Sequence, residues 1–303
     1  MNDLEKFKGI FPAFYACYDA EGNVSAERTK KLVNYFYDKG ARGLYITGSS
    51  GESIYQTADE RKIIIESVME VAKEKMVIIA HVGAPSTRDS VELAKWAKTC
   101  GVDAIASIPP IYFPFSEKSV QQYWKRMIDA ADMPFIIYNI PHLTGFNMSK
   151  KFLQTMLEDS RVIGVKNTSL PVMDIQQFKD CGGKNCIIYN GPDEQLAAGL
   201  LMGADGGIGG TYGIMPELFI EIYNSVQKKD FEKAKNIQYD VTNLIMELLE
   251  MDGHMLAVVK EILKIRGLDI GIAREPLPPI TTTDIPKIDA LEKKVTATIA
   301  KYC

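Results

Sequence analysis

The sequence predicts a (β/α)8 TIM barrel followed by a C-terminal helical extension. Over the first three quarters of the chain, short β-branched and aromatic runs alternate with longer amphipathic segments, as in repeated βα units. Eight such runs follow one another without a linker-like interruption, and eight units close a barrel of this class. The alternative, a doubly wound open sheet, usually has a GxGxxG motif after its first strand, and no such motif follows the first run.

The eight apolar runs are the expected strands, and residues that favour helix ends flank the segments between them. The strands are expected at residues 10–18, 43–47, 76–81, 104–108, 135–138, 162–166, 187–190 and 206–209. Capping residues stand before several of the following helices, and glycines stand after them. These residues are Ser25, Thr57, Ser86 and Ser116 at the starts, and Gly40, Gly101 and Gly203 at the ends. Glu60 lies three residues after Thr57, which predicts a capping box.

Strand signals stop at about residue 230, which divides the chain into a barrel, residues 1–229, and an extension, residues 230–303. The extension is expected to form helices at 231–250, 254–266 and 284–301. Residues 274–279 (REPLPP) should be extended, because closely spaced prolines exclude a helix there.

The composition excludes several classes of protein. The chain has 303 residues, of which 46% are hydrophobic and 24% are charged, as in ordinary globular proteins. A net charge of −4, without a run of five like charges, argues against a partner that is a nucleic acid or a membrane surface. We therefore expect a small-molecule partner.

The expected location is the cytoplasm. No apolar run approaches the roughly 20 residues of a spanning helix, and the charged N-terminus lacks the apolar region of a secretion signal. The 5 cysteines are scattered and form no CxxC pair, so neither disulfides nor a zinc site are expected.

Lys166 is the first candidate for chemistry, because catalytic groups in such barrels lie at the C-terminal ends of strands. It follows the apolar stretch 162–165 of the sixth expected strand, so its amine should enter the barrel mouth. A lysine attacks a carbonyl only as the neutral amine, and desolvation favours that form. The alternative is a surface lysine that simply marks a strand end, which is the commoner case for a single lysine.

Other strand ends carry groups suited to binding or proton transfer. Ser49 and Ser50 offer hydroxyls and close backbone N–H groups to a carboxylate, although glycine and serine are also ordinary turn residues. Tyr138 either exchanges a proton through its phenol or is an amphipathic core residue. Asp193 and Glu194 either cap the next helix or bind sugar hydroxyls.

Histidine-based metal chemistry and a serine hydrolase are not indicated. His81, His142 and His254 lie in three separate segments without a metal-ligand spacing, and we expect them to be structural or solvated. No GxSxG elbow is present.

Together, these motifs resemble those of the N-acetylneuraminate lyase family. They are GSSGE at 48–52, YNIP at 138–141, GVKNTS at 164–169 and GPDE at 191–194. This family belongs to the pyruvate-dependent class I aldolases, which also include dihydrodipicolinate synthase. The resemblance extends over essentially the whole chain, including residues 274–279 and the helical tail.

The resemblance implies a role for each motif. Lys166 would form a Schiff base with pyruvate or the C2 ketone of sialic acid, and Tyr138 would relay a proton at the substrate C4 hydroxyl. Ser49 and Ser50 would hold the substrate carboxylate. Positions that match sugar contacts are Thr168, Gly191, Asp193, Glu194 and Gly210, and Tyr112 matches a tyrosine that supports the catalytic one near a subunit contact.

The implied reaction is the reversible cleavage of N-acetylneuraminate to pyruvate and N-acetylmannosamine by a homotetramer. The protonated imine on Lys166 serves as the electron sink, so no metal or organic cofactor is implied. Dihydrodipicolinate synthases usually have an arginine shortly after the tyrosine motif, whereas His142, Leu143 and Thr144 stand there. The Asp193–Glu194 pair is the one seen in sialic acid lyases.

One departure from the family pattern keeps alternatives open. Sialic acid lyases commonly have a serine at the position of Gly210, and Thr211 is a candidate to supply the missing hydroxyl. The alternatives are a related aldolase or dehydratase acting on another 2-keto-3-deoxy sugar acid, and a non-catalytic sensor that binds a carboxylate.

Overall fold

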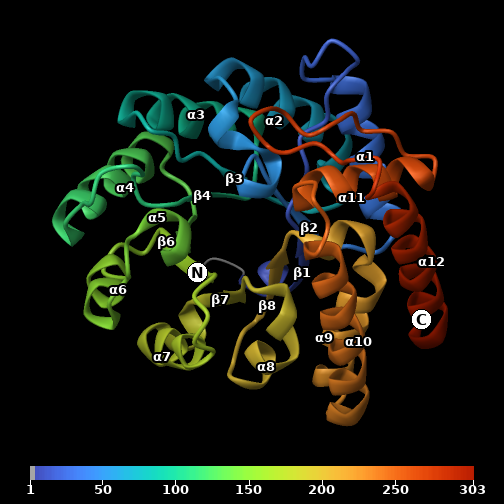
Figure 1. Cartoon of the computed structure of the whole chain (residues 1–303). Coiled ribbons are helices and arrows are strands. Elements are labelled where there is room, and N and C mark those ends of the chain that lie inside the picture. Colours follow the sequence, from blue (N-terminus) through green and yellow to red (C-terminus); the bar gives the residue numbers. More distant parts are fainter. Residues whose placement is uncertain (1–3) are drawn as a thin grey trace.

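Eight parallel strands form a nearly closed barrel with helices around it (Figure 1). The structure, a computed structural model, describes residues 4–303. In order around the barrel, the strands are β1 (Gly9–Pro12), β8 (Gly206–Gly209), β7 (Ile187–Asn190), β6 (Val162–Asn167), β5 (Phe135–Asn139), β4 (Ala104–Ser107), β3 (Val77–His81) and β2 (Gly43–Ile46). The Arg42 N–H donates to the Ile10 carbonyl at 3.1 Å, which joins β2 to β1. The predicted fold class is confirmed.

The helices around the barrel begin where the sequence predicts. Ser25, Thr57, Ser86 and Ser116 each accept a hydrogen bond from the third residue after them, and Thr57 and Glu60 form the predicted capping box. The α-helices are α1 (Ala26–Asp38), α2 (Ala58–Ala72), α3 (Thr87–Cys100), α4 (Glu117–Ala131), α5 (Pro141–Thr144), α6 (Lys150–Met156), α7 (Met173–Gly182), α8 (Leu196–Leu201) and α9 (Pro216–Gln227). Short 3-10 helices lie at η1 (Leu4–Phe7), η2 (Ser49–Gly51), η3 (Ser53–Tyr55), η4 (Gly183–Asn185), η5 (Asp193–Gln195) and η6 (Thr211–Ile214).

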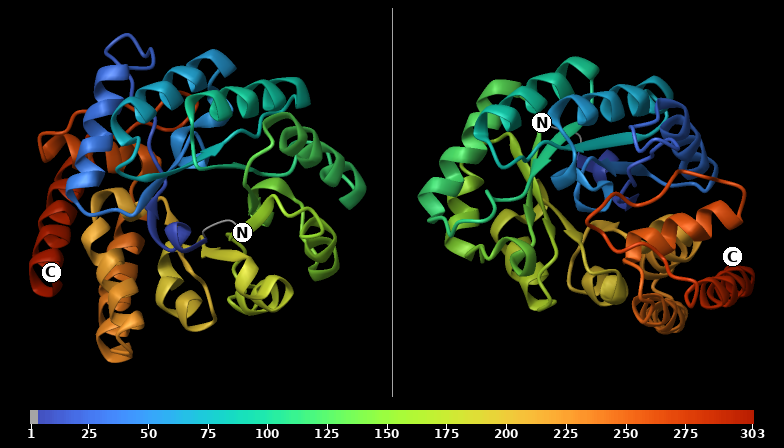
Figure 2. Two further views of the ribbon diagram at one scale, coloured as in Figure 1. Left: turned by 180° about the vertical axis from the view of Figure 1, so that it is seen from behind. Right: turned by 45° about the horizontal axis from the view of Figure 1, so that its top comes forward.

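The C-terminal helices are α10 (Phe231–Leu249), α11 (Met255–Ile265) and α12 (Ile285–Tyr302), close to the predicted ranges. They gather on one side of the barrel next to α9 (Figures 1 and 2). Residues 274–279 are not helical, but the segment turns once, because the Leu277 N–H donates to the Arg274 carbonyl at 3.1 Å. The expectation of a fully extended segment is therefore wrong. The division of the chain at residues 229 and 230 stays a prediction.

The first strand is shorter than predicted. Residues 13–18 are all buried, but the strand ends at Pro12: Ala13 forms only an isolated bridge with Tyr45, and residues 14–17 belong to no strand. The Tyr18 N–H donates to the Ile270 carbonyl of the C-terminal segment at 3.0 Å. The end of this run is buried against the C-terminal segment and not within the sheet, so hydrophobicity alone did not mark the end of the strand.

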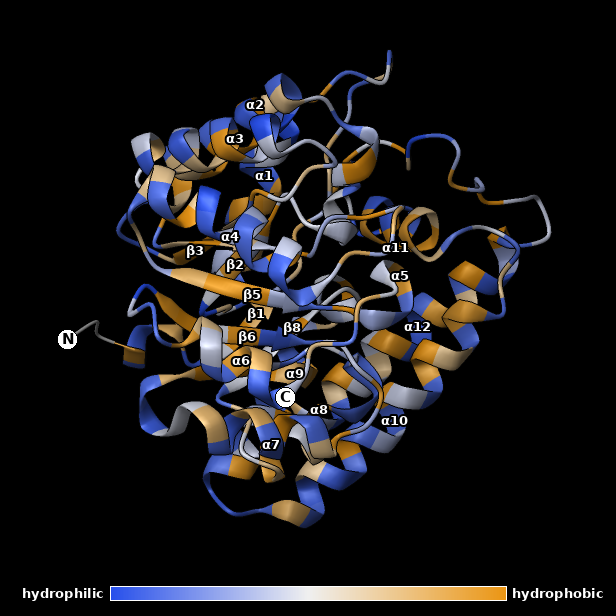
Figure 3. Cartoon of the chain, turned by 90° about the vertical axis from the view of Figure 1, so that its left-hand side faces the viewer, coloured by the Kyte–Doolittle hydropathy of each residue, from blue (hydrophilic) through white to orange (hydrophobic). Residues whose placement is uncertain are grey.

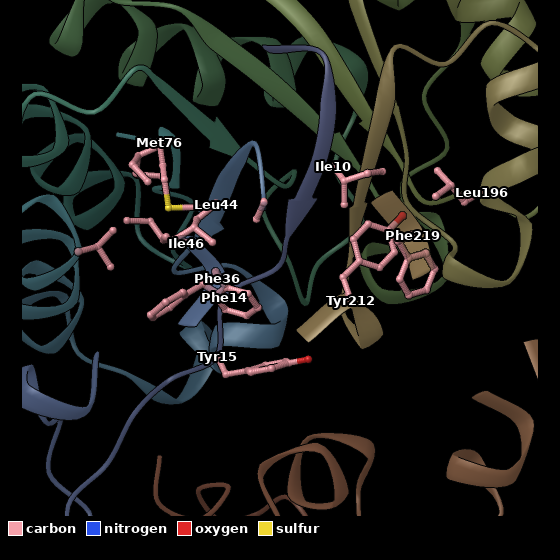
Figure 4. Close-up of a cluster of buried hydrophobic side chains, with 14 of the residues drawn as sticks. Ile10, Phe14, Tyr15, Phe36, Leu44, Ile46, Met76, Leu196, Tyr212 and Phe219 are labelled. Carbon is pink, nitrogen blue, oxygen red and sulfur yellow. The ribbon is translucent and has the colours of Figure 1, made fainter. Parts of the chain in front are cut away.

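Two buried layers hold the barrel. Its interior contains Phe11, Tyr45, Ile79, Ile136, Tyr189 and Ile208 among others, and a larger cluster fills the space between strands and helices. Figure 4 shows part of this second cluster, including Tyr212 stacked on Phe219 with ring centroids 3.9 Å apart. In Figure 3 the strand β5 is mainly hydrophobic, whereas the surrounding helices mix hydrophilic and hydrophobic residues.

The structure tests the expectation about a membrane-spanning helix but not the one about a secretion signal. None of the helices within residues 4–303 combines the length and the hydropathy needed to cross a bilayer. Residues 1–3, which begin the segment expected to carry no secretion signal, lie outside the described residues.

Candidate active site

Lys166 and Tyr138 are neighbours at the mouth of the barrel. They are register partners on the adjacent parallel strands β6 and β5, so both side chains point into the interior. The Lys166 Nζ lies 3.9 Å from the ring centre of Tyr138 and 4.5 Å from that of Tyr45. The rings of Tyr45 and Tyr138 meet edge to face with centroids 5.7 Å apart. The amine therefore lies in an aromatic pocket near the C-terminal ends of the strands.

The surroundings of Lys166 differ from those of an ordinary surface lysine. Only 5% of the residue is exposed. Within residues 4–303, no carboxylate lies within ion-pair distance of its Nζ, and no hydrogen-bond partner is present. These facts exclude the surface-lysine alternative and leave the amine free for a ligand.

The turn after β2 presents unoccupied hydrogen-bond donors. Within the described part of the chain, the N–H and hydroxyl groups of Ser49 and Ser50 make no hydrogen bonds. A Cβ at Gly48 would lie 2.6 Å from the ring of Tyr45, so only glycine lets the turn approach the ring that borders Lys166. The turn can therefore offer two N–H groups and two hydroxyls to an anion near the amine.

Asp193 is buried and joins the ends of β7 and β8. Its Oδ2 accepts hydrogen bonds from the N–H and the Oγ1 of Thr211, both at 2.6 Å. Burial raises the pKa of Asp193 to about 7, although the two hydrogen bonds from Thr211 oppose the rise. Asp193 thus binds the first N–H group of η6 and does not cap α8.

The hydrogen bond between Thr211 and Asp193 also shows whether the Thr211 hydroxyl is available to a ligand. Its hydroxyl already donates to Asp193 and its side chain is buried. The hypothesis that Thr211 replaces the hydroxyl missing at Gly210 therefore has no support in the geometry. A Cβ at Gly210 would lie 3.1 Å from the Ser50 Oγ, which places this glycine beside the serine turn.

Thr168, Gly191 and Glu194 lie at the ends of β6 and β7. A Cβ on Gly191 would collide with Thr168, so glycine is required there. The buried Thr168 Oγ1 has no hydrogen-bond partner within residues 4–303, and no ion pair forms with the half-buried Glu194 carboxylate in that range. Both groups remain available to hydroxyls of a ligand.

Tyr112 is the one predicted site residue that this chain does not bring to Lys166. It is 91% exposed, and its ring contacts only Phe113 among the rings of the described residues, at 4.9 Å between centroids. Its φ of +81° is unusual for a tyrosine. Its supporting role stays a prediction.

A buried histidine and a buried arginine form hydrogen bonds with backbone groups at the strand ends that surround the barrel mouth. The neutral ring of His81 uses both nitrogens, since Nδ1 contacts the Thr47 carbonyl at 3.1 Å and Nε2 accepts the Ile108 N–H at 3.2 Å. Burial, with the nearby Arg61, lowers the pKa of His81 well below its usual range. Arg61 donates to the carbonyls of Gly83 at 2.8 Å and His81 at 2.5 Å. His81 is thus structural, as expected.

The other two histidines differ in exposure. His142 is exposed, and the Nδ1 of His254 accepts the Leu256 N–H at 3.2 Å at the start of α11. Within residues 4–303, no group of three or more His, Cys, Asp or Glu side chains is placed to hold a metal ion.

The sequence did not single out the residues that surround the predicted ones. Tyr45 borders the amine, yet in the sequence it is one more aromatic residue of a buried strand. Glu52 was noticed only as part of a motif, and its partners lie more than 200 residues away. Alternation along β2 could have suggested that Tyr45 faces the interior.

A cavity of about 460 Å³ opens at the mouth beside the serine turn. One wall carries Ser49 and Ser50, and the C-terminal residues His254 and Met255 form another. Leu143, which follows the tyrosine motif, also lines it. The cavity is therefore bounded by both the barrel and the extension.

Comparisons with known proteins show the family of the chain. Residues 6–295 match the model of the dihydrodipicolinate synthetase family. The chain is 49% identical to an N-acetylneuraminate lyase of Mediterraneibacter gnavus over 94% of this chain and 91% of the relative. It is 35% identical to N-acetylneuraminate lyase 2 of Escherichia coli, over 96% and 95% of the two chains.

Solved structures give the same picture. A sialic acid aldolase of Ruminococcus gnavus, described as a catalytic lysine mutant, superposes with a TM-score of 0.99 at 46% identity, covering 100% of both chains. A dihydrodipicolinate synthase of Bacillus anthracis superposes with a TM-score of 0.89 at 25% identity, covering 95% and 98%.

Proposed function

The chain belongs to the dihydrodipicolinate synthetase family, and on this premise we propose that it is a carbon–carbon lyase that cleaves N-acetylneuraminate reversibly to pyruvate and N-acetylmannosamine. The observation that carries the chemistry is the buried, unpaired Lys166 amine beside the Tyr138 ring at the barrel mouth. The choice of substrate is supported by relatives of 49% and 35% identity that are N-acetylneuraminate lyases.

In the first step, the neutral amine of Lys166 attacks the C2 ketone of the open-chain sugar acid. Loss of water from the adduct gives a protonated imine on Nζ. The amine is buried beside the rings of Tyr138 and Tyr45, which keep it apart from bulk water. The free donors of Ser49 and Ser50 hold the adjacent carboxylate and orient the ketone.

In the second step, the Tyr138 oxygen takes the proton of the C4 hydroxyl while its own phenolic proton passes to the substrate carboxylate. The C3–C4 bond then breaks, its electron pair enters the imine system as an enamine, and the C4 carbon leaves as the aldehyde of N-acetylmannosamine. Protonation of C3 and hydrolysis of the imine release pyruvate and restore the amine. Because the imine accepts the electrons, the proposed reaction requires neither a metal nor an organic cofactor.

The sugar chain of the substrate is proposed to lie toward β7 and β8. Thr168 and Glu194 have polar groups without partners among the described residues. Asp193 lies with Gly191 and Gly210 at the same end of the barrel.

A second candidate is a related aldolase or dehydratase for another 2-keto-3-deoxy sugar acid. Gly210 favours it, because the hydroxyl common at this position in sialic acid lyases is missing and Thr211 is already bonded to Asp193. The residues after the tyrosine motif speak against a dicarboxylic substrate, since none of His142, Leu143 and Thr144 is an arginine.

The proposed assembly is a homotetramer located in the cytoplasm. Tyr112 and Phe113 are 91% and 65% exposed, and adjacent exposed aromatic rings suit a subunit contact. All 5 cysteines are free, in keeping with a reducing compartment. Sedimentation analysis would test the assembly, and a monomer in solution would contradict it.

Borohydride trapping tests the chemistry. The protein is incubated with N-acetylneuraminate and borohydride, modified peptides are mapped by mass, and released N-acetylmannosamine is assayed. A pyruvate-sized adduct on Lys166, with the amino sugar released, is expected. The variant Lys166→Ala, checked for folding by circular dichroism, should give neither.

Other outcomes separate the alternatives. An adduct with pyruvate but not with N-acetylneuraminate would favour the second candidate. No adduct with either compound would exclude an imine enzyme and leave a carboxylate sensor.

A further inference from the structure

Glu52 ends the serine turn in a conformation that its neighbours must hold. Its φ is +56°, in the left-handed region where residues other than glycine are uncommon. Its N–H donates to the Ser49 carbonyl at 2.9 Å, and the next N–H, of Ser53, donates to the Gly48 carbonyl at 3.3 Å. The backbone at Glu52 thus fixes the shape of the turn that presents the free donors of Ser49 and Ser50.

The Glu52 side chain leaves the turn and binds the C-terminal extension. Its Oε1 accepts a hydrogen bond from the Lys260 Nζ of α11 at 2.6 Å, and its Oε2 accepts the Arg274 N–H at 2.8 Å. Lys260 also donates to the Ile272 carbonyl at 3.0 Å and lies 4.6 Å from the ring centre of Tyr18. Both side chains of the ion pair are almost completely buried, at 2% and 0% exposure.

Further bonds tie the same end of the turn to the extension. The Arg274 guanidinium donates to the Tyr55 carbonyl at 2.9 Å and to Glu60 at 2.7 Å. Its charged group lies 4.5 Å from the ring centre of Tyr18, which also lies against Lys260. The extension therefore fixes the backbone both at Glu52 and three residues after it.

A buried ion pair of this kind contributes little net free energy to folding. The cost of removing two charges from water often equals the gain from pairing them, and a well-packed apolar pair serves folding as well. What such a pair does provide is a defined geometry, because a charged acceptor fixes its donors more strongly than a neutral one. Here the geometry is that of the turn opposite the Lys166 amine.

We propose that Glu52 is a positioning residue for the substrate carboxylate, and that Lys260 of the extension is the counter-ion that holds it. Glu52 acts through the turn and does not itself touch the substrate. The extension then takes part in recognition of the carboxylate, although Lys166 and Tyr138 both lie on barrel strands. This inference rests on the proposed pyruvate chemistry.

The test uses the full-length protein and variants that change the charges but not the shape. In Glu52→Gln, the amide has the shape of the carboxylate but must turn its NH2 toward the Lys260 ammonium or the Arg274 N–H, and both are donors. Glu292→Gln is the matched control, because it breaks the Arg266–Glu292 ion pair of the extension (3.1 Å), which does not contact the turn.

The measurement is the ligand concentration that gives half-maximal borohydride-trapped adduct. Pyruvate is compared with its methyl ester, which has the same ketone but no charged carboxylate. Glu52→Gln should raise the half-saturating pyruvate concentration about tenfold, the effect of one charge-assisted hydrogen bond, and leave that of the ester unchanged. Glu292→Gln should match the wild type for both compounds.

Misfolding is separated from loss of positioning by a second variant. Glu52→Gln combined with Lys260→Met has no buried charge, so it should fold even where the single variant does not. We expect its preference for pyruvate over the ester to be lower than that of the wild type. The proposal is overturned by a folded variant that keeps the wild-type preference, or by equal losses for both compounds. A wild-type protein that traps no pyruvate would instead overturn the proposed function, and this inference with it.

Discussion

Two buried lysines of this protein have similar surroundings but different partners. Lys166, at the barrel mouth, is 5% exposed and lies over the rings of Tyr138 and Tyr45. Lys260, in the extension, is 2% exposed and lies over the ring of Tyr18. Glu52 neutralises Lys260 at 2.6 Å, whereas no carboxylate within residues 4–303 forms an ion pair with Lys166.

The difference shows what prepares a lysine for covalent chemistry. Aromatic surroundings and burial are common to both residues, so neither is sufficient. A carboxylate bonded to an amine occupies its Nζ, and an occupied amine cannot approach a carbonyl carbon. The lysine without a partner is the one that can react, and the paired lysine is the one that can hold a loop in place.

The sharpest test of this contrast replaces each lysine with arginine. Arginine cannot form the imine, so Lys166→Arg should lower turnover of N-acetylneuraminate by about four orders of magnitude or more. Lys260→Arg keeps a cation opposite Glu52 and should retain most of the turnover. Pyruvate release measures both rates, and similar losses in the two variants would contradict the distinction.

A smaller effect is expected from the tyrosines beside the two lysines. Tyr138→Phe keeps the ring next to Lys166 but removes the hydroxyl proposed to move the proton, so kcat should fall about 10²- to 10⁴-fold with little change in KM. Tyr18→Phe keeps the ring next to Lys260 and is the matched control, with kcat expected near that of the wild type. A wild-type kcat for Tyr138→Phe would exclude Tyr138 as the relay.

Two carboxylates extend the contrast to pH dependence. Burial raises the pKa of Asp193 at the mouth to about 7 from 3.8. Its contribution to stability is therefore fully present below pH 3.8 and is lost as the pH rises toward 7. Burial also acts to raise the pKa of Asp284 in the extension, but the N–H groups of Thr281, Asp252 and Gly253 hold it at about 2. The contribution of Asp284 is lost as the pH falls toward 2.

Between pH 4 and pH 7, the free energy of unfolding should therefore fall less in Asp193→Asn than in the wild type. Denaturant unfolding of the wild type and this variant at several pH values measures the effect. Asp284→Asn should leave this pH range unchanged and lower the stability at neutral pH. Parallel curves for Asp193→Asn and the wild type would show that Asp193 does not titrate in this range.

The smallest effect is expected at Gly210. A serine there would place its Cβ 3.1 Å from the Ser50 Oγ and 3.4 Å from the Met255 Cε, at a backbone conformation that suits any residue. The added hydroxyl should lower KM for N-acetylneuraminate severalfold, about 1 kcal/mol, and leave kcat unchanged. Steady-state kinetics of Gly210→Ser checks this, and a raised KM would show that the site has no room for the hydroxyl.

The sequence predicted the parts of the site that follow from strand order. Lys166 and Tyr138 end successive strands, and in a parallel barrel neighbouring strand ends must come together. The eight strands themselves were predictable because each buried strand is a short apolar run in the sequence.

Contacts between distant segments were not predictable in this way. Glu52 and Lys260 are 208 residues apart, and neither segment contains a signal for the other. The bond between Asp193 and Thr211 depends on the exact approach of two loops. The end of the run at 10–18 was taken for strand because burial outside the sheet, as at Tyr18 beside Ile270, produces the same pattern as burial in a sheet.

Residues 9–18 also bear on the order in which the parts of the molecule fold during synthesis. The strand β1 pairs with β8, so residues 9–12 have no strand partner on that side until residues 206–209 have been made. The acceptor of the Tyr18 N–H, the carbonyl of Ile270, is made later still. Contacts over such long separations close slowly. Residues 9–18 are therefore among the last parts of the barrel to reach their final structure.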